Sequence, residues 1–291
     1  MIFKCDYGIA IQGEFMKFEN KTYGEERALY GIEDSLVIGC SFEGEEDGES
    51  ALKECRNIKV SDCDFKLRYP FWHTTGAEIE NIRMADTCRA AFWYDEDISI
   101  RDSRLHGIKA LRECNRVGLD SCDVISAEFG WKCSNINIEK SFVRSEYPFF
   151  ECRDMTASAL RLEGKYSFQY IENATFHDCI FNTKDAFWHA KNVTVYDSVV
   201  SGEYLGWYSE NLRLVRCKIS GTQPLCYCRG LVLVDCEMVD TDLSFERSEV
   251  EADVKGNIVS VKNPLKGHIS ADSIGEIIDY REENGCVITV K

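Results

Sequence analysis

The sequence has no apolar run that approaches the roughly 20 residues needed by a membrane-spanning helix. Its first fifteen residues, MIFKCDYGIAIQGEF, contain an early acid and lack the basic stretch that precedes the apolar part of a secretory leader. Both absences predict a protein that does not interact with membranes, and we expect it to be cytoplasmic.

Proline and positive charge are also scarce. Only four prolines and no low-complexity tract interrupt the 291 residues, so no linker is expected to divide the chain. Lys and Arg total 34 against 50 Asp and Glu, which gives a net charge of −16. The resulting field should repel phosphate backbones, and we predict no nucleic-acid partner.

Cysteine, by contrast, is abundant. Fifteen cysteines in a long chain without a leader predict free buried thiols rather than a secreted disulfide framework. Cys226 and Cys228 lack the second ligand pair of a zinc site, and the acidic run EGEEDGES lacks the ligand order of a calcium loop. We therefore assign no metal site, and the sequence identifies no cofactor.

A repeat of 19 residues organises most of the chain. Its segments start with a turn-forming residue and continue with alternating Ile, Val or Leu, at Asp97, Arg116, Asn135, Asp154, Asn173, Asn192, Asn211 and Gly230. Two irregular coils anchored at Asn57 and Asn81, with steps of 24 and 16, precede them, and a first coil starts at Asp34. The anchors are mostly Asn, Asp or Gly, which tolerate a left-handed backbone at a corner.

Short alternating strands at a constant period predict an all-β, single-stranded, right-handed parallel β-helix of about 11 or 12 coils over residues 34–248. Residues 1–33 and 249–291 break the rule, and we expect them to cap the ends, the second with a hairpin around Asn284 and Gly285. The cysteines fall into two files of this ladder, where small side chains suit a narrow interior. One file contains Cys63, Cys122, Cys179, Cys217 and Cys236; the other contains Cys55, Cys114, Cys133, Cys152 and Cys228.

The triplet Phe-Trp-His occurs at residues 71–73 and again at 187–189, in a column of similar triplets that we interpret as a third strand. Strand alternation predicts that the third residue of each triplet faces solvent and the middle one, often Trp, faces the interior. The same parity turns Phe71, Phe149, Phe168 and Phe187 outward, and it turns Arg112 and Gln169 inward, where they need partners. A bulge would reverse part of this assignment.

We interpret the outward positions as a strip that binds an oligosaccharide or glycoconjugate, because flat rings suit sugar C–H faces and polar neighbours suit hydroxyls. The predicted ligand-binding residues are His73, Tyr147, Tyr166, Phe168, Tyr170, Asp185, Phe187, Tyr204, Tyr208, Gln223, Tyr227, Asp242 and Glu246. The alternative is a non-catalytic scaffold that recognises a protein through the strip. A homo-oligomer is compatible with either function.

Glu113, Lys132, Glu151 and His189 are the candidate catalytic residues. The two glutamates stand two rungs apart, on the order of 9 to 10 Å between backbones, near the wide end expected for an inverting glycosidase pair. A Glu-Lys-Glu charge ladder is the alternative. His189 could act as a general base or as a binding ring. If the protein is an enzyme, we expect a glycoside hydrolase or an activity like that of a polysaccharide lyase.

Motifs along almost the whole chain resemble a microbial family catalogued as domain of unknown function 3737. They are GEEDGESALKE, LRYPFWH, LHGIKALREC, GKYSFQY, DAFWHA, GEYLGWYS, GTQPLCYC and DTDLSFE. The resemblance implies the right-handed parallel β-helix of the pectin-lyase-like superfamily. Polysaccharide lyases of that superfamily commonly use a basic catalytic residue and Ca²⁺ held by acids, but this constellation matches no set of residues here, and the resemblance implies no activity.

Overall fold

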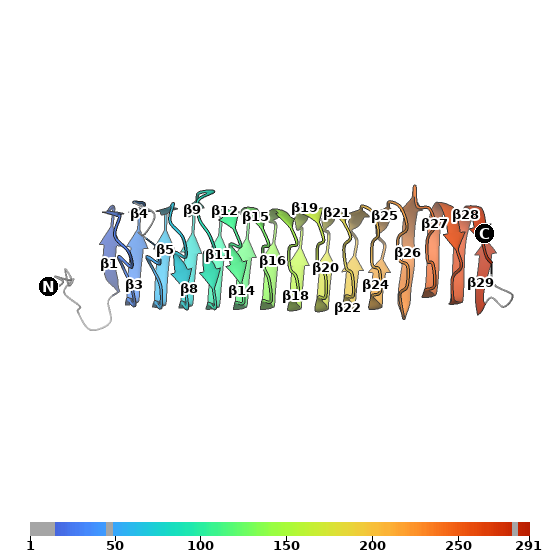
Figure 1. Cartoon of the computed structure of the whole chain (residues 1–291), viewed down its shortest axis with the longest axis horizontal. Helices are drawn as coiled ribbons and strands as arrows, with labels where there is room; N and C mark the ends of the chain where they lie inside the picture. The colour runs from blue at the N-terminus through green and yellow to red at the C-terminus, as the bar shows by residue number, and fades with distance from the viewer. Residues whose placement is uncertain (1–14, 45–48, 281–284) are drawn as a thin grey trace.

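The structure, a computed structural model, describes residues 15–44, 49–280 and 285–291. In these residues 29 β-strands wind into a solenoid of about 14 turns (Figure 1). The predicted parallel β-helix is confirmed, with more turns than the expected 11 or 12. Within these ranges, no helix has the length and apolar character that a bilayer crossing requires.

Two long parallel ladders form two sides of the solenoid. The first consists of β1 (Met16–Glu19), β3 (Glu33–Ile38), β5 (Arg56–Ser61), β8 (Thr75–Glu80), β11 (Glu96–Arg101), β14 (Asn115–Asp120), β16 (Ser134–Glu139), β18 (Arg153–Ser158), β20 (Glu172–His177), β22 (Lys191–Tyr196) and β24 (Glu210–Val215). The second consists of β2 (Thr22–Tyr23), β4 (Ser41–Phe42), β6 (Asp64–Phe65), β9 (Arg83–Met84), β12 (Arg104–Ile108), β15 (Asp123–Ala127), β17 (Phe142–Glu146), β19 (Arg161–Lys165), β21 (Ile180–Lys184), β23 (Val199–Ser201) and β25 (Lys218–Ser220).

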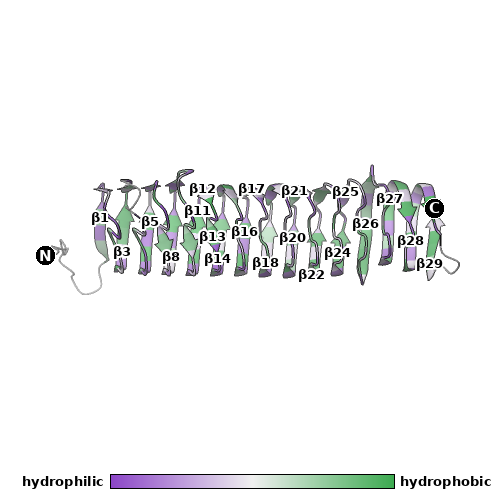
Figure 2. Cartoon of the chain, in the orientation of Figure 1, coloured by the Kyte–Doolittle hydropathy of each residue, from purple (hydrophilic) through white to green (hydrophobic). Residues whose placement is uncertain are grey.

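The two ladders merge near the C-terminus and a short third sheet lies beside them. β26 (Leu231–Val239) pairs with both β24 and β25 and is followed by β27 (Glu249–Lys262), β28 (Lys266–Ile278) and β29 (Gly285–Val290). The third sheet contains only β7 (Phe71–Trp72), β10 (Phe92–Trp93) and β13 (Leu111–Arg112). Apolar and polar residues alternate along the strands (Figure 2), because one side of each strand faces the interior.

The anchors of the repeat have the left-handed backbone predicted for them. Their φ values are 57° at Asn173, 53° at Asn192 and 55° at Asn211. Asn192 Nδ2 donates to Asn173 Oδ1 at 3.1 Å and Asn211 Nδ2 donates to Asn192 Oδ1 at 3.0 Å. The corner is therefore stabilised both by residue type and by an amide ladder between turns.

The register differs from the prediction in one early turn. Thr75 pairs with Arg56 in the preceding turn and with Glu96 in the following one, so the steps are 19 and 21 rather than 24 and 16. Asn81 lies at the next corner, where its Nδ2 donates to Asp62 Oδ1 at 2.6 Å. The choice of Asn81 as an anchor was wrong, because Asn is favoured at both the corner before a strand and the corner after it.

The stack extends beyond the boundaries expected for its caps. β1 already pairs in parallel with β3, and β27 and β28 continue the ladder past residue 248. β29 pairs with β28 in parallel, with Gly285 opposite Lys266, so these strands do not form the expected antiparallel hairpin. Asn284 itself lies outside the described residues.

The fourteen cysteines in the described ranges are buried and free, which confirms the predicted thiols. In the file that contains Cys63 and Cys122, a backbone N–H at the corner donates to the side chain at the same position of the next turn. The Cys40 N–H donates to Cys63 Sγ at 3.3 Å, and the Cys122 N–H donates to Ser141 Oγ at 3.0 Å. Cys63 Sγ in turn donates to Ser61 O at 3.1 Å. Burial raises the pKa of Cys63 to about 12, so the thiol keeps the proton that it donates. The file thus supplies acceptors to buried corner amides.

Candidate functional site

The third side of the solenoid is a strand in only three turns. From Gly130 onward it is a series of turns in which every second residue has positive φ, as at Tyr166 (60°), Phe168 (59°) and Tyr170 (57°). The expectation that the column of triplets forms a third strand was therefore wrong from Gly130 onward. Since this backbone is not extended, the two-residue alternation of strands does not apply to it.

The first residue of the triplet points inward both in the strands, as at Phe71, and in the later turns, as at Phe149. Phe168 and Phe187 are fully buried, so the prediction that they contact a ligand was wrong. The middle residue is buried at Gln169 and Cys226, as predicted, but the tryptophans are only half-buried. Trp188 stacks on Trp207 with 5.5 Å between centroids and 1° between planes. Arg112 lies in this middle file, between Trp93 and Trp131, with its guanidinium carbon 5.7 and 5.1 Å from their ring centroids.

The third residue of the triplet faces solvent, as predicted. Tyr170, His189, Tyr208 and Tyr227 form one continuous stack over four turns, which we call the aromatic stack. Successive centroids are 4.9, 5.0 and 4.9 Å apart, and the interplanar angles are 7°, 9° and 13°. Tyr170 and Tyr208 are 47% and 42% exposed.

This stacking changes what the rings offer to a ligand. Each inner ring of the aromatic stack contacts its neighbours through both faces, so solvent reaches its edge and its polar tip rather than a flat face. The expected platform of open aromatic faces is therefore absent within the stack. A row of phenol hydroxyls and an imidazole, one per turn, is present instead.

Several other predicted residues hold the tryptophans in place. The indole Nε1 of Trp131 donates to Tyr147 O at 2.6 Å, that of Trp188 to Tyr204 O at 3.0 Å, and that of Trp207 to Gln223 O at 2.8 Å. The side chain of Tyr147 also stacks on Tyr166, with 4.5 Å between centroids. The half-buried tryptophans are thereby fixed in orientation.

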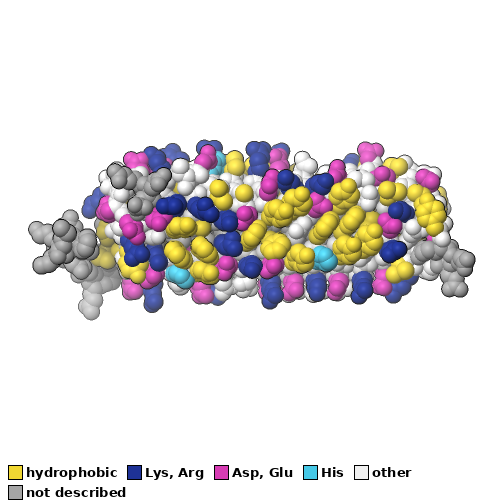
Figure 3. Space-filling view, viewed as in Figure 1, with side chains coloured by type: hydrophobic (Ala, Val, Ile, Leu, Met, Phe, Trp, Pro, Cys, Tyr) yellow, Lys and Arg dark blue, Asp and Glu magenta, His cyan; other side chains and the backbone are white. Residues whose placement is uncertain are grey.

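A smaller ring group lies toward the N-terminus. His73 is exposed and stacks on Tyr94 at 5.1 Å, and Trp72 stacks on Trp93 at 5.6 Å. Figure 3 shows hydrophobic side chains gathered in two groups along the viewed face, with basic side chains between them. His73 thus belongs to a group separate from the aromatic stack.

Glu113, Lys132 and Glu151 follow one another in the outer file between the two ring groups, as predicted. Arg112 Nε lies 3.3 Å from Glu113 Oε1, and Lys132 Nζ lies 3.6 Å from Glu151 Oε2. Each carboxylate therefore has a cationic neighbour, but only Lys132 and Glu151 pair between neighbouring turns as in a charge ladder.

Replacing Glu151 with Gln is expected to change the free energy of unfolding by less than about 1 kcal/mol, because both partners of its ion pair are half exposed. Chemical denaturation of the two proteins measures this change. Loss of turnover on an identified substrate, with stability unchanged, would instead support a catalytic role for this side chain.

Three predicted residues at the strip need correction. Asp185 was expected in solvent but is 5% exposed, and burial raises the pKa of its carboxyl. Asp242 and Glu246 lie one residue out of register, because the Gln223 amide donates to Asp242 O and the Tyr227 amide donates to Glu246 O. This turn is one residue longer than the 19-residue repeat. Leu243 and Arg247 therefore occupy the positions equivalent to Gln223 and Tyr227.

A groove of about 510 Å³ adjoins the C-terminal end of the aromatic stack. His189, Tyr208 and Tyr227 form its aromatic wall. The sequence analysis did not identify its other lining residues, which are Glu210, Cys228, Arg229, Arg247, Glu249 and Leu265. The groove brings phenol, imidazole, carboxylate and guanidinium groups to one surface.

Some of these charges belong to a ladder that the 19-residue period could have revealed. Basic and acidic residues alternate turn by turn at Arg153, Glu172, Lys191, Glu210, Arg229, Glu249 and Lys266. A row of alternating charges runs below the larger hydrophobic group in Figure 3. The groove therefore lies where the aromatic stack meets a charged edge.

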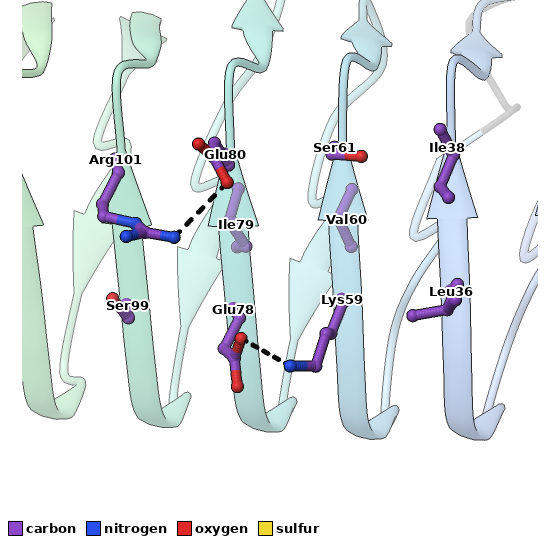
Figure 4. A pocket seen from close by; sticks show the side chains of 10 residues that line it. All are labelled: Leu36, Ile38, Lys59, Val60, Ser61, Glu78, Ile79, Glu80, Ser99 and Arg101. Atoms are coloured by element: carbon purple, nitrogen blue, oxygen red, sulfur yellow. Dashed lines mark hydrogen bonds and ion pairs between the residues drawn. The ribbon is translucent and has the colours of Figure 1, made fainter. Parts of the chain in front are cut away.

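Another cavity, of about 450 Å³, lies over β3, β5, β8 and β11 (Figure 4). Its charged side chains pair with each other: Lys59 Nζ is 2.8 Å from Glu78 Oε2, and Arg101 Nη2 is 3.3 Å from Glu80 Oε2. It has no aromatic lining, and we do not place the functional site there. Across the described ranges, no three His, Cys, Asp or Glu side chains are placed to hold a metal ion.

The family described as "Protein of unknown function (DUF3737)" matches residues 16–290. The chain belongs to this family. The resemblance noted in the sequence is thus confirmed, and the DUF3737 description specifies no activity. A comparison with curated protein sequences finds no match.

Solved structures resemble this DUF3737 protein at low sequence identity. PfbA, a surface adhesin of Streptococcus pneumoniae, has a TM-score of 0.50 and 9% identity over 84% of this chain and 86% of that chain. A tailspike protein mutant of E. coli bacteriophage HK620 in complex with a hexasaccharide has a TM-score of 0.49 and 8% identity over 91% and 70%. The mannuronan C-5 epimerase AlgE4 A-module of Azotobacter vinelandii has a TM-score of 0.30 and 10% identity over 94% and 87%. At these identities the likeness concerns the fold alone.

Proposed function

We propose that this protein binds an oligosaccharide, free or as part of a glycoconjugate, along the aromatic stack and in the adjoining groove. The observation that carries the proposal is the groove itself, where an aromatic wall meets carboxylates and guanidinium groups. Sugars present hydroxyls that both donate and accept, and apolar C–H surfaces between them. A groove with apolar ring edges, acceptors from Glu210 and donors from Arg229 matches both properties.

The outer file adds a repeating element to this recognition. The side chains of Tyr170, Tyr208 and Tyr227 each carry a hydroxyl, and their rings stand in register from turn to turn. Successive hydroxyls can thus bond successive units of a ligand that lies along the solenoid. His189 contributes a ring nitrogen to the same row, and we assign it a binding role.

The test compares Tyr208→Ala with wild type by calorimetric titration of a sugar first identified on a glycan array. We expect the affinity to fall about tenfold, which corresponds to about 1.4 kcal/mol of lost contact. Tyr208→Phe separates the two contributions, because it keeps the ring edge and removes the hydroxyl.

Tyr196 provides the matched control, since it stacks on His177 at 4.6 Å in the first ladder, away from the groove. Tyr196→Ala should leave the affinity unchanged. Binding that is lost equally in both variants, or the absence of any glycan ligand, would contradict the proposal.

A second candidate function is recognition of a protein partner. The stacked ring faces favour it, because inner rings offer edges rather than the open faces that sugars stack on. Trp, Tyr and Arg, which border this surface, are also the residues most enriched at protein-binding hot spots. A partner that Tyr208→Ala releases and that no array sugar displaces would favour this function.

A further inference from the structure

β29 ends the solenoid with an edge that pairs with no other strand of the described residues. On its inner side it pairs with β28 through six residue pairs, from Lys266–Gly285 to Ala271–Val290. The outward N–H and C=O groups of such a strand form a template for another strand.

Apolar side chains gather at the same end. Ile277, Tyr280, Val287 and Val290 are 50%, 81%, 62% and 54% exposed, and only one other large hydrophobic residue in the described ranges, Ile180, reaches 50%. The sequence of β29, GCVITV, has no charge and no proline. Natural edge strands usually carry one of these to prevent pairing.

β29 also leaves part of the core uncovered. It pairs with Lys266–Ala271 of β28, where Ile269 and Ala271 are fully buried. The rest of β28 extends beyond the end of β29, and Ile277 there is half exposed. The core is thus closed where β29 covers it and open beside it.

We propose that two copies of this chain associate through this end, with β29 of one copy pairing antiparallel to β29 of the other about a two-fold axis. A second copy presents the same uncharged edge, and isologous pairing of identical edges closes the assembly. The net charge of −16 on each chain opposes association, and an uncharged strand adds no further repulsion at the contact.

The opposite end of the solenoid is less suited to receive β29. β1, the strand at that end, carries the charged residues Lys17 and Glu19. Head-to-tail stacking would also remain open at both ends and build filaments. A closed pair is therefore the arrangement that this edge favours.

Light scattering coupled to size-exclusion chromatography tests the proposal on the full chain. Wild type should have twice the 33.3 kDa mass of the chain at micromolar concentrations. Val287→Lys combined with Thr289→Lys should halve that mass, because pairing would bring like charges opposite one another. Unchanged circular dichroism of the variant would show that the solenoid is still folded.

The control is Ile180→Lys, which adds one lysine at an exposed apolar residue on β21 in the middle of the stack. It should remain a dimer. A second measurement, hydrogen exchange, should show β29 amides that become protected as concentration rises in wild type and not in the double variant. A monomeric wild type at every concentration, or a mass that keeps growing, would overturn the closed pairing.

Discussion

Phe168→Ala is expected to lower the free energy of unfolding by about 3–5 kcal/mol, the range for a buried phenylalanine truncated to alanine. Phe168 is fully buried, and its ring centroid lies 5.4, 5.0, 5.1 and 5.0 Å from those of Phe149, Phe176, Phe181 and Phe187. Each turn of a solenoid contacts only its neighbours, so no distant part of the core compensates for the cavity. Chemical denaturation measures the effect.

Phe150→Ala is the control that separates the observed packing from strand alternation. Phe150 is half-buried in the middle file, and its ring centroid lies 5.2 Å from that of Trp131 and 5.6 Å from that of Tyr170. We expect the smaller loss for this variant. If the third side alternated as a strand does, Phe168 would face solvent and Phe150 the core, and the order of the two variants would be reversed.

The sequence predicts the solenoid because its period is also the physical repeat of the structure. Residues 19 apart become vertical neighbours, so the packing of Trp188 on Trp207 and the two cysteine files follow from counting. Both long ladders are true strands, and alternation places their core residues correctly.

The third side could not be predicted in the same way, because alternation describes extended backbone only. A signal was nevertheless available: Gly130 and Gly206 stand where other turns have phenylalanine, and both have positive φ, 77° and 73°. Glycine in such a column indicates a left-handed conformation, which Phe149, Phe168 and Phe187 share. The sequence did not reveal the extra residue in the turn that contains Phe245, because a step of 19 residues places Ser244, rather than Phe245, opposite Leu225.

The groove was missed for a different reason. Its charged residues belong to the corner beyond the triplet, and single charges on a solvated edge do not reveal a site. Only the fold shows that Arg247 follows Tyr227 in the outer file and that Glu210 and Arg229 border the same rings.

Asp95 is an acid that the core holds without a full set of partners. It is completely buried; its Oδ1 accepts the Thr74 amide at 2.8 Å, and its Oδ2 has no hydrogen-bond partner in the described ranges. Burial raises the pKa of Asp95 well above its ordinary value, and the nearby Cys114 raises it further. The folded protein therefore keeps this carboxyl protonated at a pH where an unfolded chain ionises it.

The pH dependence of stability follows from this difference. Above the unfolded pKa of about 3.9 the native state binds one more proton than the unfolded state, so the free energy of unfolding falls as pH rises, by about 1.4 kcal/mol per pH unit, until the folded pKa is reached. Asp95→Asn keeps the acceptor for Thr74 and cannot ionise, so it should remove this slope. Chemical denaturation of both proteins from pH 4 to pH 8 measures this slope. The slope is compared rather than the stability at one pH, because the new amide NH₂ also changes the free energy of unfolding itself.

Asp97→Asn is the control, because the pKa of Asp97, two residues from Asp95 in the sequence, is shifted in the opposite direction. Arg116 Nη2 donates to Asp97 Oδ2 at 2.9 Å and lowers the pKa of that exposed carboxyl. The stabilisation from ionised Asp97 is present above the pKa of the unfolded chain and is lost as pH falls through the pKa of the folded protein. Asp97→Asn should therefore flatten only the acid side of the plot of unfolding free energy against pH. A wild-type stability that does not fall between pH 4 and pH 8 relative to Asp95→Asn would mean that Asp95 is ionised in the core.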